Sequence, residues 1–288
     1  MRTFVSVANL AFATVASAIN CNGNAALCDR KYSNVTFVGA HNSPFVGALP
    51  TQNQLSDVTA QLNKGIRFLT AQTHDKDGAV QLCHTECGLE DAGTLQSYLS
   101  TIKTWLDGNT NEVVTLLLTN GDAIDLSKFS DAFKASGLDT YTYAPTADLS
   151  LADWPTLGEI VASKKRLIVF MDYNADISKV SYILDEFKYY FETPFDPTDS
   201  QLLECNIDRP SGASANGRMY LVNHNLNAEV FGISIPDIGA ASKTNSESSI
   251  LAHSDICIGK YSRDPNVILL DYISLGNPIA AQNTLNEI

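Results

Sequence analysis

Seven apolar segments recur along the chain, and each has the length of a buried β-strand. They are rich in valine, isoleucine, leucine and phenylalanine and carry few charges. Near-continuous apolar runs of this kind are typical of strands that are covered on both faces. The segments span residues 35–41, 66–72, 79–84, 112–120, 166–173, 219–225 and 267–273.

Segments with helical spacing lie between several of these strands. In residues 94–106, large apolar side chains recur three and four positions apart, at Leu95, Tyr98, Leu99, Ile102, Trp105 and Leu106. Residues 178–191 repeat the pattern, and residues 53–63 repeat it more weakly. The aromatic side chains in these segments are most simply core residues.

Alternating strands and helices predict a parallel sheet covered by helices. The length and the strand count favour a barrel over an open, doubly wound sheet. Neither GxGxxG nor GxxxxGK[ST] occurs in the chain, which removes the nucleotide-binding form of the open sheet. We therefore predict an α/β fold, a single-domain distorted TIM (β/α) barrel over residues 19–288.

The first eighteen residues, "MRTFVSVANLAFATVASA", have the layout of a secretory signal peptide. A basic residue, Arg2, precedes an apolar stretch, and the small residues Ala16, Ser17 and Ala18 form a cleavage pattern. We predict that residues 1–18 are removed and that the mature protein is secreted, soluble and extracellular.

Acidic residues outnumber basic ones by 32 to 19, which gives a net charge of −13. This balance argues against nucleic acid as a partner and against electrostatic attraction to anionic membranes. Aromatic residues in 140–145 and 188–195 could touch a lipid surface, but we expect most of them in the core. The predicted partners are a phospholipid or other phosphodiester substrate and at most a transient membrane surface, with the protein a monomer.

Six cysteines in a secreted chain predict disulfides. Their spacing favours the pairs Cys21–Cys28, Cys83–Cys87 and Cys205–Cys257, although other pairings are open. A zinc site would use the same residues, but no CxxC spacing occurs. The sequence Asn34-Val35-Thr36 is an N-glycosylation sequon close to the first predicted strand.

Polar side chains follow most of the predicted strands, at the end of a barrel where active sites lie. The set comprises His41, Asn42, Gln72, His74, His84, Asn120, Asp122, Asp172, Asn174, Asn223, Asn225 and Asp271. Strand ends are also where chains turn, so a single asparagine or aspartate there needs no function. Two histidines at strand ends are harder to explain in this way. Because histidine exchanges protons near neutral pH, a facing pair can serve as base and acid across one reacting bond.

Two stretches resemble a known family. They are "FVGAHNSPFVG" and "LNKGIRFLTAQTHDKDGAVQLCHTECGLEDAGTLQSYLSTIKTWLDGNTNEVVTLLLTN". The sequence resembles the X region of phosphatidylinositol-specific phospholipase C, in the secreted fungal branch of the PLC-like phosphodiesterases. The resemblance continues through "FMDYNAD", "FETPFDPTD", "NHNLN" and "LLDYISLGN". It implies a distorted barrel of the PLC-like type and cleavage of a glycerophosphoinositol-type diester through a cyclic phosphate.

The resemblance also implies roles for individual residues. His41 would be the general base on the inositol 2-hydroxyl, and His84 the general acid towards the diacylglycerol oxygen. Asn42 stands at a position that is asparagine in the eukaryotic enzymes and aspartate in the bacterial ones. Asp271, on the last strand and so beside the first in a closed barrel, is predicted from that geometry to orient His41.

The sequence departs from the family on its second strand. Thr70 and Gln72 stand where calcium-dependent members carry acidic residues and bacterial members carry an aspartate and an arginine. Because calcium prefers carboxylates among its oxygen ligands, we expect no cofactor and no tightly bound metal, with weak binding of a divalent cation such as calcium left open. Arg67 is close in sequence but has the wrong strand parity.

The charge on the phosphate must then be met elsewhere. Arg218, Arg263 and Lys260 are candidates to supply it from loops, and His74 is a further candidate donor. The predicted substrate-binding residues are Asn42, Thr70, Gln72, His74, Asp172 and Asn223.

Three functions are compatible with the sequence. The first is a secreted phosphodiesterase that uses His41 and His84 as an acid–base pair. The second is a barrel that has lost its charged phosphate clamp and binds a lipid headgroup or a glycan without cleaving it. The third is a glycoside hydrolase that uses Asp172 and Asp271, which ranks last because it leaves both histidines unexplained.

Overall fold

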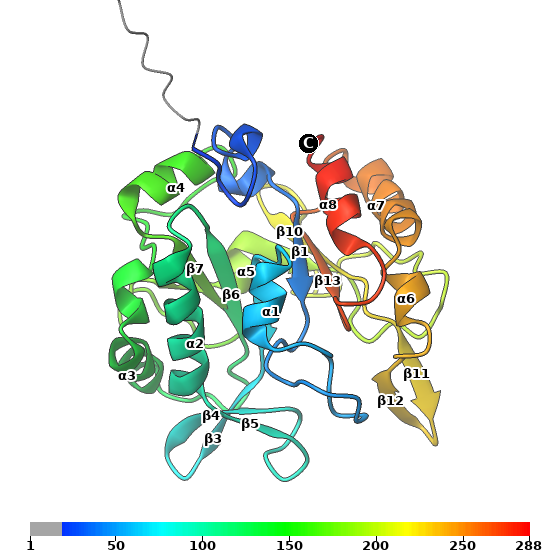
Figure 1. Cartoon of the computed structure of the whole chain (residues 1–288), viewed down its shortest axis with the longest axis horizontal. Helices are drawn as coiled ribbons and strands as arrows, with labels where there is room; N and C mark the ends of the chain where they lie inside the picture. Colours follow the sequence, from blue (N-terminus) through cyan, green and yellow to red (C-terminus); the bar gives the residue numbers. More distant parts are fainter. Residues whose placement is uncertain (1–18) are drawn as a thin grey trace, which may run out of the picture.

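The computed structural model describes residues 19–288, and its centre is a curled sheet of eight parallel strands in the order β8-β7-β6-β2-β1-β13-β10-β9 (Figure 1). The strands are β1 (Phe37–Ala40), β2 (Phe68–Ala71), β6 (Val114–Leu118), β7 (Leu167–Met171), β8 (Ile183–Asp185), β9 (Tyr190–Glu192), β10 (Met219–Asn223) and β13 (Val267–Leu270). Within residues 19–288, no ladder joins β8 to β9, so the barrel has an open seam between them. The predicted distorted TIM barrel is confirmed.

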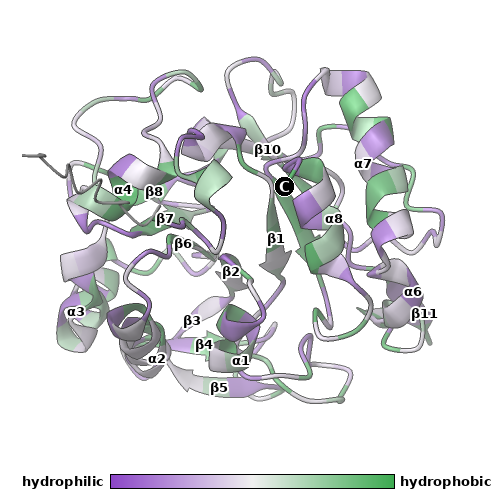
Figure 2. Cartoon of the chain, turned by 45° about the horizontal axis from the view of Figure 1, so that its top comes forward, coloured by the Kyte–Doolittle hydropathy of each residue, from purple (hydrophilic) through white to green (hydrophobic). Residues whose placement is uncertain are grey.

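Helices cover the outside of this sheet. They are α1 (Val58–Asn63), α2 (Leu95–Gly108), α3 (Leu126–Ser136), α4 (Leu157–Ser163), α5 (Glu186–Tyr189), α6 (Ala241–Thr244), α7 (Glu247–Tyr261) and α8 (Pro278–Leu285). Short 3-10 helices lie at Ala25–Leu27, Tyr32–Asn34 and Leu138–Tyr141. In Figure 2 the central strands are mostly apolar, whereas α7 and α8 alternate between apolar and polar residues.

The predicted helix at 94–106 is present as α2, and its buried residues are the six that the apolar spacing indicates. It begins at Thr94, whose side chain accepts a hydrogen bond from Ser97 N. The weaker helix predicted at 53–63 is shorter, because Asp57 caps α1 and the residues before it form a loop. No helix among residues 19–288 is long and apolar enough to cross a bilayer. The predicted signal peptide, residues 1–18, lies outside the described part of the chain.

Strand residues alternate between two apolar clusters. One set, including Val38, Leu69 and Leu116, packs outward against the helices. The other set, including Phe37 and Leu117, fills the barrel together with Tyr32 and Trp154. Inward-facing residues of a barrel strand recur at every second position. This alternation also fixes which residue beyond the end of each strand faces the mouth of the barrel.

The interior of the barrel is closely packed around Gly39 on β1. A Cβ atom at this position would lie 3.0 Å from Leu269 Cδ1 and 3.2 Å from Val267 Cγ1. Such contacts are tighter than ordinary van der Waals packing. A larger residue at this inward position, two residues before His41, would require the neighbouring side chains to shift by a few tenths of an ångström.

Two predictions about individual segments are wrong. Residues 79–84 do not form a barrel strand. Their residues Ala79–Cys83 form β4, the middle strand of a separate antiparallel sheet with β3 (Thr73–Lys76) and β5 (Asp91–Thr94). β4 is only five residues long, and its buried residues Val80 and Leu82 stand two positions apart, so its sequence does not distinguish a hairpin strand from a barrel strand.

Residues 178–191 do not form one helix. They contain β8, the short α5 and most of β9. Ile183 and Leu184 fit the spacing of a helix and also the alternation of a strand. In the structure Ile183 packs outward and Leu184 packs inward, as on a strand that is covered on both faces. Pairing of β8 with β7 and of β9 with β10 overrides the local helical pattern.

Three disulfides join the predicted pairs, Cys21–Cys28, Cys83–Cys87 and Cys205–Cys257. A second hairpin, β11 (Asn227–Val230) and β12 (Ile233–Pro236), projects from the segment that follows β10. In Figure 1 this hairpin and the β3-β4-β5 sheet lie at the same end of the barrel, towards which β1 and β13 point.

Candidate active site at the barrel mouth

A cavity of about 310 Å³ opens at the carboxyl ends of the barrel strands. Leu117 and Leu269, the last inward apolar residues of β6 and β13, belong to its lining. The predicted residues that line it are His41, Asn42, Thr70, Gln72, His84, Asp172 and Asn223. Asn225, named among the polar residues at strand ends, also lines it, and the sequence analysis missed Asn53, Thr119, Glu186, Glu192, Asp196, Arg209 and Asn227.

His41 is held by Asp271 from the neighbouring strand. The β1–β13 ladder pairs Ala40 with Leu270, so the next residue of each strand meets its counterpart. His41 Nδ1 lies 2.9 Å from Asp271 Oδ1, which also accepts a hydrogen bond from Asn53 Nδ2 at 2.8 Å. Gln54 fixes the two strand ends, because its Nε2 donates to His41 O and to Leu270 O.

Two opposing effects act on the pKa of His41. Burial lowers the pKa. The negative charge of Asp271 and the hydrogen bond to that carboxylate together raise it by more than burial lowers it, so the pKa of His41 is raised overall. With Nδ1 bound to Asp271, His41 presents Nε2 to the cavity.

His84 reaches the same cavity from the loop that follows β4. Its Nδ1 donates to Thr51 O at 2.7 Å, and its ring stacks on Phe45 with ring centres 5.2 Å apart. The Cys83–Cys87 disulfide closes the loop around it. Burial is the main effect on its pKa and lowers it, and the nearby His41 lowers it as well. The structure therefore brings both histidines to one cavity with opposite shifts in pKa.

The residues at the metal-ligand positions of calcium-dependent relatives do not fit calcium. Thr70 Oγ1 accepts the backbone N–H of Asn42 at 2.8 Å, and Gln72 Oε1 accepts that of Thr85 at 2.9 Å. Both oxygens thus hold the backbone of the site in place, and neither belongs to a carboxylate. Asn42 has a left-handed backbone (φ 47°), and its buried Nδ2 has no partner among the described residues. Asn42 can therefore donate a hydrogen bond to a ligand in the cavity.

A charged cluster that the sequence analysis missed forms the wall on the side of the seam. Arg209 Nε donates to Glu192 Oε2 at 3.0 Å, and Glu192 is buried. Residues 208–209 run antiparallel to β9 through a bridge between Glu192 and Arg209. Burial lowers the pKa of Arg209, but the attraction of Glu192 outweighs this effect and the pKa is raised.

Two further carboxyl groups in this wall have raised pKa values. Glu186 is 1% exposed, and neither of its carboxyl oxygens has a partner among residues 19–288. Burial, and next the charge of Glu192, raise its pKa well above the usual value. Burial also raises the pKa of Asp172 to about 6, against two backbone N–H donors at Asn120 and Tyr173 that lower it.

Several predicted residues lie outside the cavity. His74 is bonded to Asp122 (3.1 Å) on the β3 hairpin. Arg67 is bonded to Glu112 on the outer side, as its strand parity predicts. Arg218 donates to Phe187 O, Lys260 to Asn206 Oδ1, and Arg263 packs over Tyr220. The structure therefore does not bring His74, Arg218, Lys260 or Arg263 to this cavity, and it holds each of them with another partner. The cation in the cavity is Arg209.

Asp271 does not line the cavity itself but lies behind His41. It therefore does not form a second carboxylate opposite Asp172, as the glycoside hydrolase hypothesis requires.

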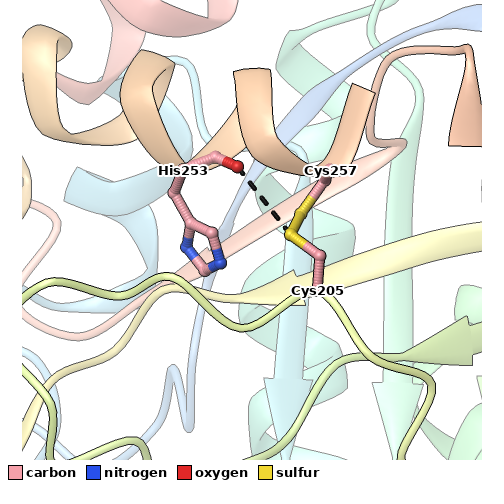
Figure 3. A group of neighbouring side chains, drawn as sticks. All are labelled: Cys205, His253 and Cys257. Atoms are coloured by element: carbon pink, nitrogen blue, oxygen red, sulfur yellow. Dashed lines mark hydrogen bonds between the residues drawn. A yellow bond between two sulfur atoms is a disulfide. The ribbon is translucent and has the colours of Figure 1, made fainter. Parts of the chain in front are cut away.

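Cys205, His253 and Cys257 are grouped like metal ligands, but they are not available to a metal. Figure 3 shows the two sulfur atoms joined in a disulfide, with the His253 carbonyl near Cys205 Sγ. His253 Nδ1 instead lies 2.9 Å from His224 Nδ1 in the core. The choice of a disulfide over a zinc site is confirmed here.

Comparisons with known proteins bear on the family and the fold. A family model described as PI-PLC X 1 matches residues 27–286. The chain is 52% identical over 300 residues to the "PI-PLC X domain-containing protein 1" of Arthroderma benhamiae, covering 100% of this chain and 98% of that protein. It is 46% identical over 270 residues to an "Uncharacterized secreted protein" of the same organism, covering 89% of this chain and 61% of that protein. This secreted relative and the three disulfides are consistent with an extracellular location.

Among solved structures, the chain is similar to the phosphatidylinositol-specific phospholipase C of Listeria monocytogenes. The TM-score is 0.59 at 14% identity, with 91% of this chain and 95% of that chain covered. At this identity the likeness concerns the fold. Since the family model spans nearly all of the described residues, the chain belongs to the PI-PLC X family.

Proposed function

We propose that this protein cleaves a glycerophospholipid-type phosphodiester, with His41 as general base and His84 as general acid. The observation that carries the proposal is that His41, held by Asp271, and His84, held by Thr51 O, line one cavity. Membership of the PI-PLC X family supports the reaction class. No step of the proposed mechanism requires a metal.

The reaction transfers one proton at each histidine. His41 Nε2 accepts the proton of a hydroxyl group close to the phosphorus, and the freed oxygen forms a bond to phosphorus. The bond from phosphorus to the leaving oxygen breaks, and His84 Nε2 gives its proton to that oxygen. The products are a cyclic phosphate and an alcohol, and one proton has moved from His84 to His41.

The two pKa shifts make each histidine stronger in its proposed role, but they make the reactive protonation state less abundant. A raised pKa makes neutral His41 a stronger base, and a lowered pKa makes protonated His84 a stronger acid. When the pair holds one proton, most molecules carry it on His41, so the reactive form is the minor one. The rate should therefore follow a bell-shaped pH profile whose two limbs belong to the pair.

The charge of the phosphate is met by two groups in this proposal. Asn42 offers its unpartnered amide, and Arg209 offers its guanidinium group from the seam. The carboxyl groups of Asp172 and Glu192 lie in the same lining and would accept hydrogen bonds from hydroxyl groups of the departing headgroup. A polyhydroxylated headgroup such as inositol fits this combination of donors and acceptors.

A second function remains in view because Glu192 already neutralises Arg209. Among the described residues, Arg209 carries the only guanidinium group that lines the cavity. Because this group is already paired with Glu192, it would stabilise the transition state only weakly. In that case the barrel would bind a lipid headgroup or a glycan without cleaving it.

The test is turnover of phosphatidylinositol and of soluble glycerophosphoinositol, each with and without EDTA. His41→Ala should abolish turnover, whereas the control His74→Ala should keep it, because His74 has the same ring but lies outside the cavity. Turnover that persists in His41→Ala would refute the proposed role of His41. Headgroup binding by a folded wild-type protein that cleaves neither substrate would favour the second function.

A further inference from the structure

The sequon Asn34-Val35-Thr36 lies at the end of the barrel opposite to the cavity. It begins at the last residue of the 3-10 helix Tyr32–Asn34 and leads into β1. In Figure 1 this segment and α8 lie at the upper end of the barrel, whereas the two hairpins lie at the lower end. The chain contains no other Asn-X-Ser/Thr sequence in which X is not proline. A group attached at Asn34 would therefore not obstruct the barrel mouth.

The residues of the sequon differ in exposure. Asn34 is exposed, whereas Val35 and Thr36 are each 2% exposed. Thr36 Oγ1 donates a hydrogen bond to Pro265 O at 2.6 Å, and Thr36 N donates to Asn286 Oδ1 at 3.0 Å. The asparagine of the sequon is thus accessible in the folded protein, but its threonine is covered by the last part of the chain.

The distance along the chain leaves time for modification before this cover forms. Transfer of a glycan to Asn-X-Thr depends on the threonine hydroxyl, which must be accessible when the transferase acts. Thr36 and Pro265 are 229 residues apart in the sequence. Synthesis at about 5–20 residues per second therefore leaves about 11–46 s between the appearance of these two residues. The sequon is open during synthesis and closes only when residues 265–286 have packed.

A cleft of about 890 Å³ lies beside Asn34, which belongs to its lining together with Arg30, Asp264 and Glu287. Asp264 and Glu287 are exposed. Burial, and next the charge of Glu287, raise the pKa of Asp264, so the two carboxyl groups lie near each other. Carboxylates accept hydrogen bonds from hydroxyl groups, and a guanidinium group donates them to oxygen. The lining is therefore suited to the hydroxyl and amide groups of a sugar.

We propose that Asn34 carries an N-linked glycan whose first N-acetylglucosamine lies in this cleft, between the segment before β1 and the residues after α8. The glycan is attached before residues 265–286 close over Thr36. The inference rests on passage through the secretory pathway, which the relative named as secreted and the three disulfides support. It does not depend on the proposed function, because the cleft and the cavity share no lining residue.

The test of attachment is the intact mass of the full chain secreted from a yeast host, before and after treatment with peptide:N-glycosidase F. Wild type should lose the mass of one glycan, and Asn34 should be recovered as aspartate. Asn34→Gln should be secreted without a glycan. The control Asn216→Gln changes an exposed asparagine outside any sequon and should keep the glycan. A wild-type mass that the enzyme leaves unchanged would overturn the proposal.

Thermal unfolding tests the place of the first sugar. Endoglycosidase H leaves one N-acetylglucosamine on Asn34, and this trimmed protein should keep the midpoint of the untrimmed one. Removal of that sugar by peptide:N-glycosidase F should lower the midpoint by about 2 °C or more, as expected when a hydrogen bond is lost from a chain of this size. Asn34→Gln should show the same lower midpoint without the added carboxylate.

Asp264→Ala removes an acceptor from the cleft, so the effect of removing the first sugar should shrink in this variant. Equal midpoints in all forms of the wild type, or an effect that is undiminished in Asp264→Ala, would overturn the placement of the sugar in the cleft.

Discussion

Replacing Asp271 by asparagine removes the charge behind His41 with little change in shape. The side chain is 5% exposed, and its Oδ1 accepts hydrogen bonds from His41 Nδ1 and Asn53 Nδ2. Its Oδ2 has no partner among the described residues, so the asparagine NH₂ can take that place without breaking a bond. The fold should therefore survive the substitution.

The size of the effect follows from the lost charge. A hydrogen bond to a charged group contributes about 1.5–3 kcal/mol and one between neutral groups about 0.5–1.5 kcal/mol, so asparagine keeps only part of the interaction with His41. The pKa of His41 should therefore fall in Asp271→Asn. Turnover should fall by up to about tenfold, because His41 becomes a weaker and less well oriented base, and the greater abundance of neutral His41 offsets part of this loss.

The pH profile separates this effect from general damage. His41 has the raised pKa of the pair, so it governs the alkaline limb, and His84, with the lowered pKa, governs the acid limb. In Asp271→Asn the alkaline limb should move to lower pH, while the acid limb stays nearly fixed. The ring resonances of His41 in an NMR titration should report the same shift without substrate.

Asp122→Asn is the matched control, because Asp122 accepts a hydrogen bond from His74 Nδ1 at 3.1 Å outside the cavity. It should leave both limbs and the rate unchanged. An alkaline limb and a His41 pKa that stay in place in Asp271→Asn would refute the argument that Asp271 sets the proton affinity of His41.

Three further predictions concern stability and loop position. Replacing Cys83 and Cys87 by serine should lower the free energy of unfolding by about 2 kcal/mol on the chain-entropy argument, which denaturant unfolding would measure. The substitution should also lower kcat, because His84 is displaced. Unchanged kcat would contradict the positioning role of the disulfide. Glu186→Gln should stabilise the protein at pH 7, because the raised pKa of Glu186 means that its contribution to folded-state stability is lost as pH rises. A variant less stable than wild type at pH 7 but not at acid pH would contradict this. Burial lowers the pKa of His224 from 6.5 to about 3, so the folded state resists protonation and its stability should fall as pH drops from 6.5 to about 3. His224→Gln should flatten the plot of stability against pH in this range. An unchanged slope would count against this role of His224.

Much of the site could be predicted because residues of a barrel strand point inward at every second position. Inward positions on β1 and β13 alternate, so His41 and Asp271 follow from the two apolar runs once the barrel is assumed to close between them. Asp172 and Asn223 follow from β7 and β10 in the same way. Asn223 is the last residue of its strand and the other three stand one position beyond theirs, where the alternation of the pattern still applies.

His84 was predicted at the site, although not for the correct structural reason. It follows an antiparallel hairpin strand outside the barrel, and its place at the cavity depends on the loop and on Thr51 O. The strand-end pattern therefore included His84 on a wrong structural assignment, and the family resemblance supported the same residue independently.

The wall on the side of the seam could not be predicted from local patterns. Glu186 and Glu192 lie in a segment whose apolar spacing fits a helix, and only pairing with β7 and β10 makes strands of its ends. Arg209 belongs to a long connection without an apolar run, so no periodicity assigns it to a face. Its position depends on the bridge to Glu192, which is a tertiary contact.

Because of the open seam, one side of the cavity is built on central strands and the other side is built on an edge strand, where the sequence can vary more freely. His41 and Asp271 stand on neighbouring central strands that are hydrogen-bonded on both sides, whereas Glu192 and Arg209 stand on an edge strand and the connection beside it. Insertions and substitutions in that connection disturb no central ladder. Descendants of such a barrel can therefore change the seam side of the cavity while the pair of His41 and Asp271 is inherited unchanged.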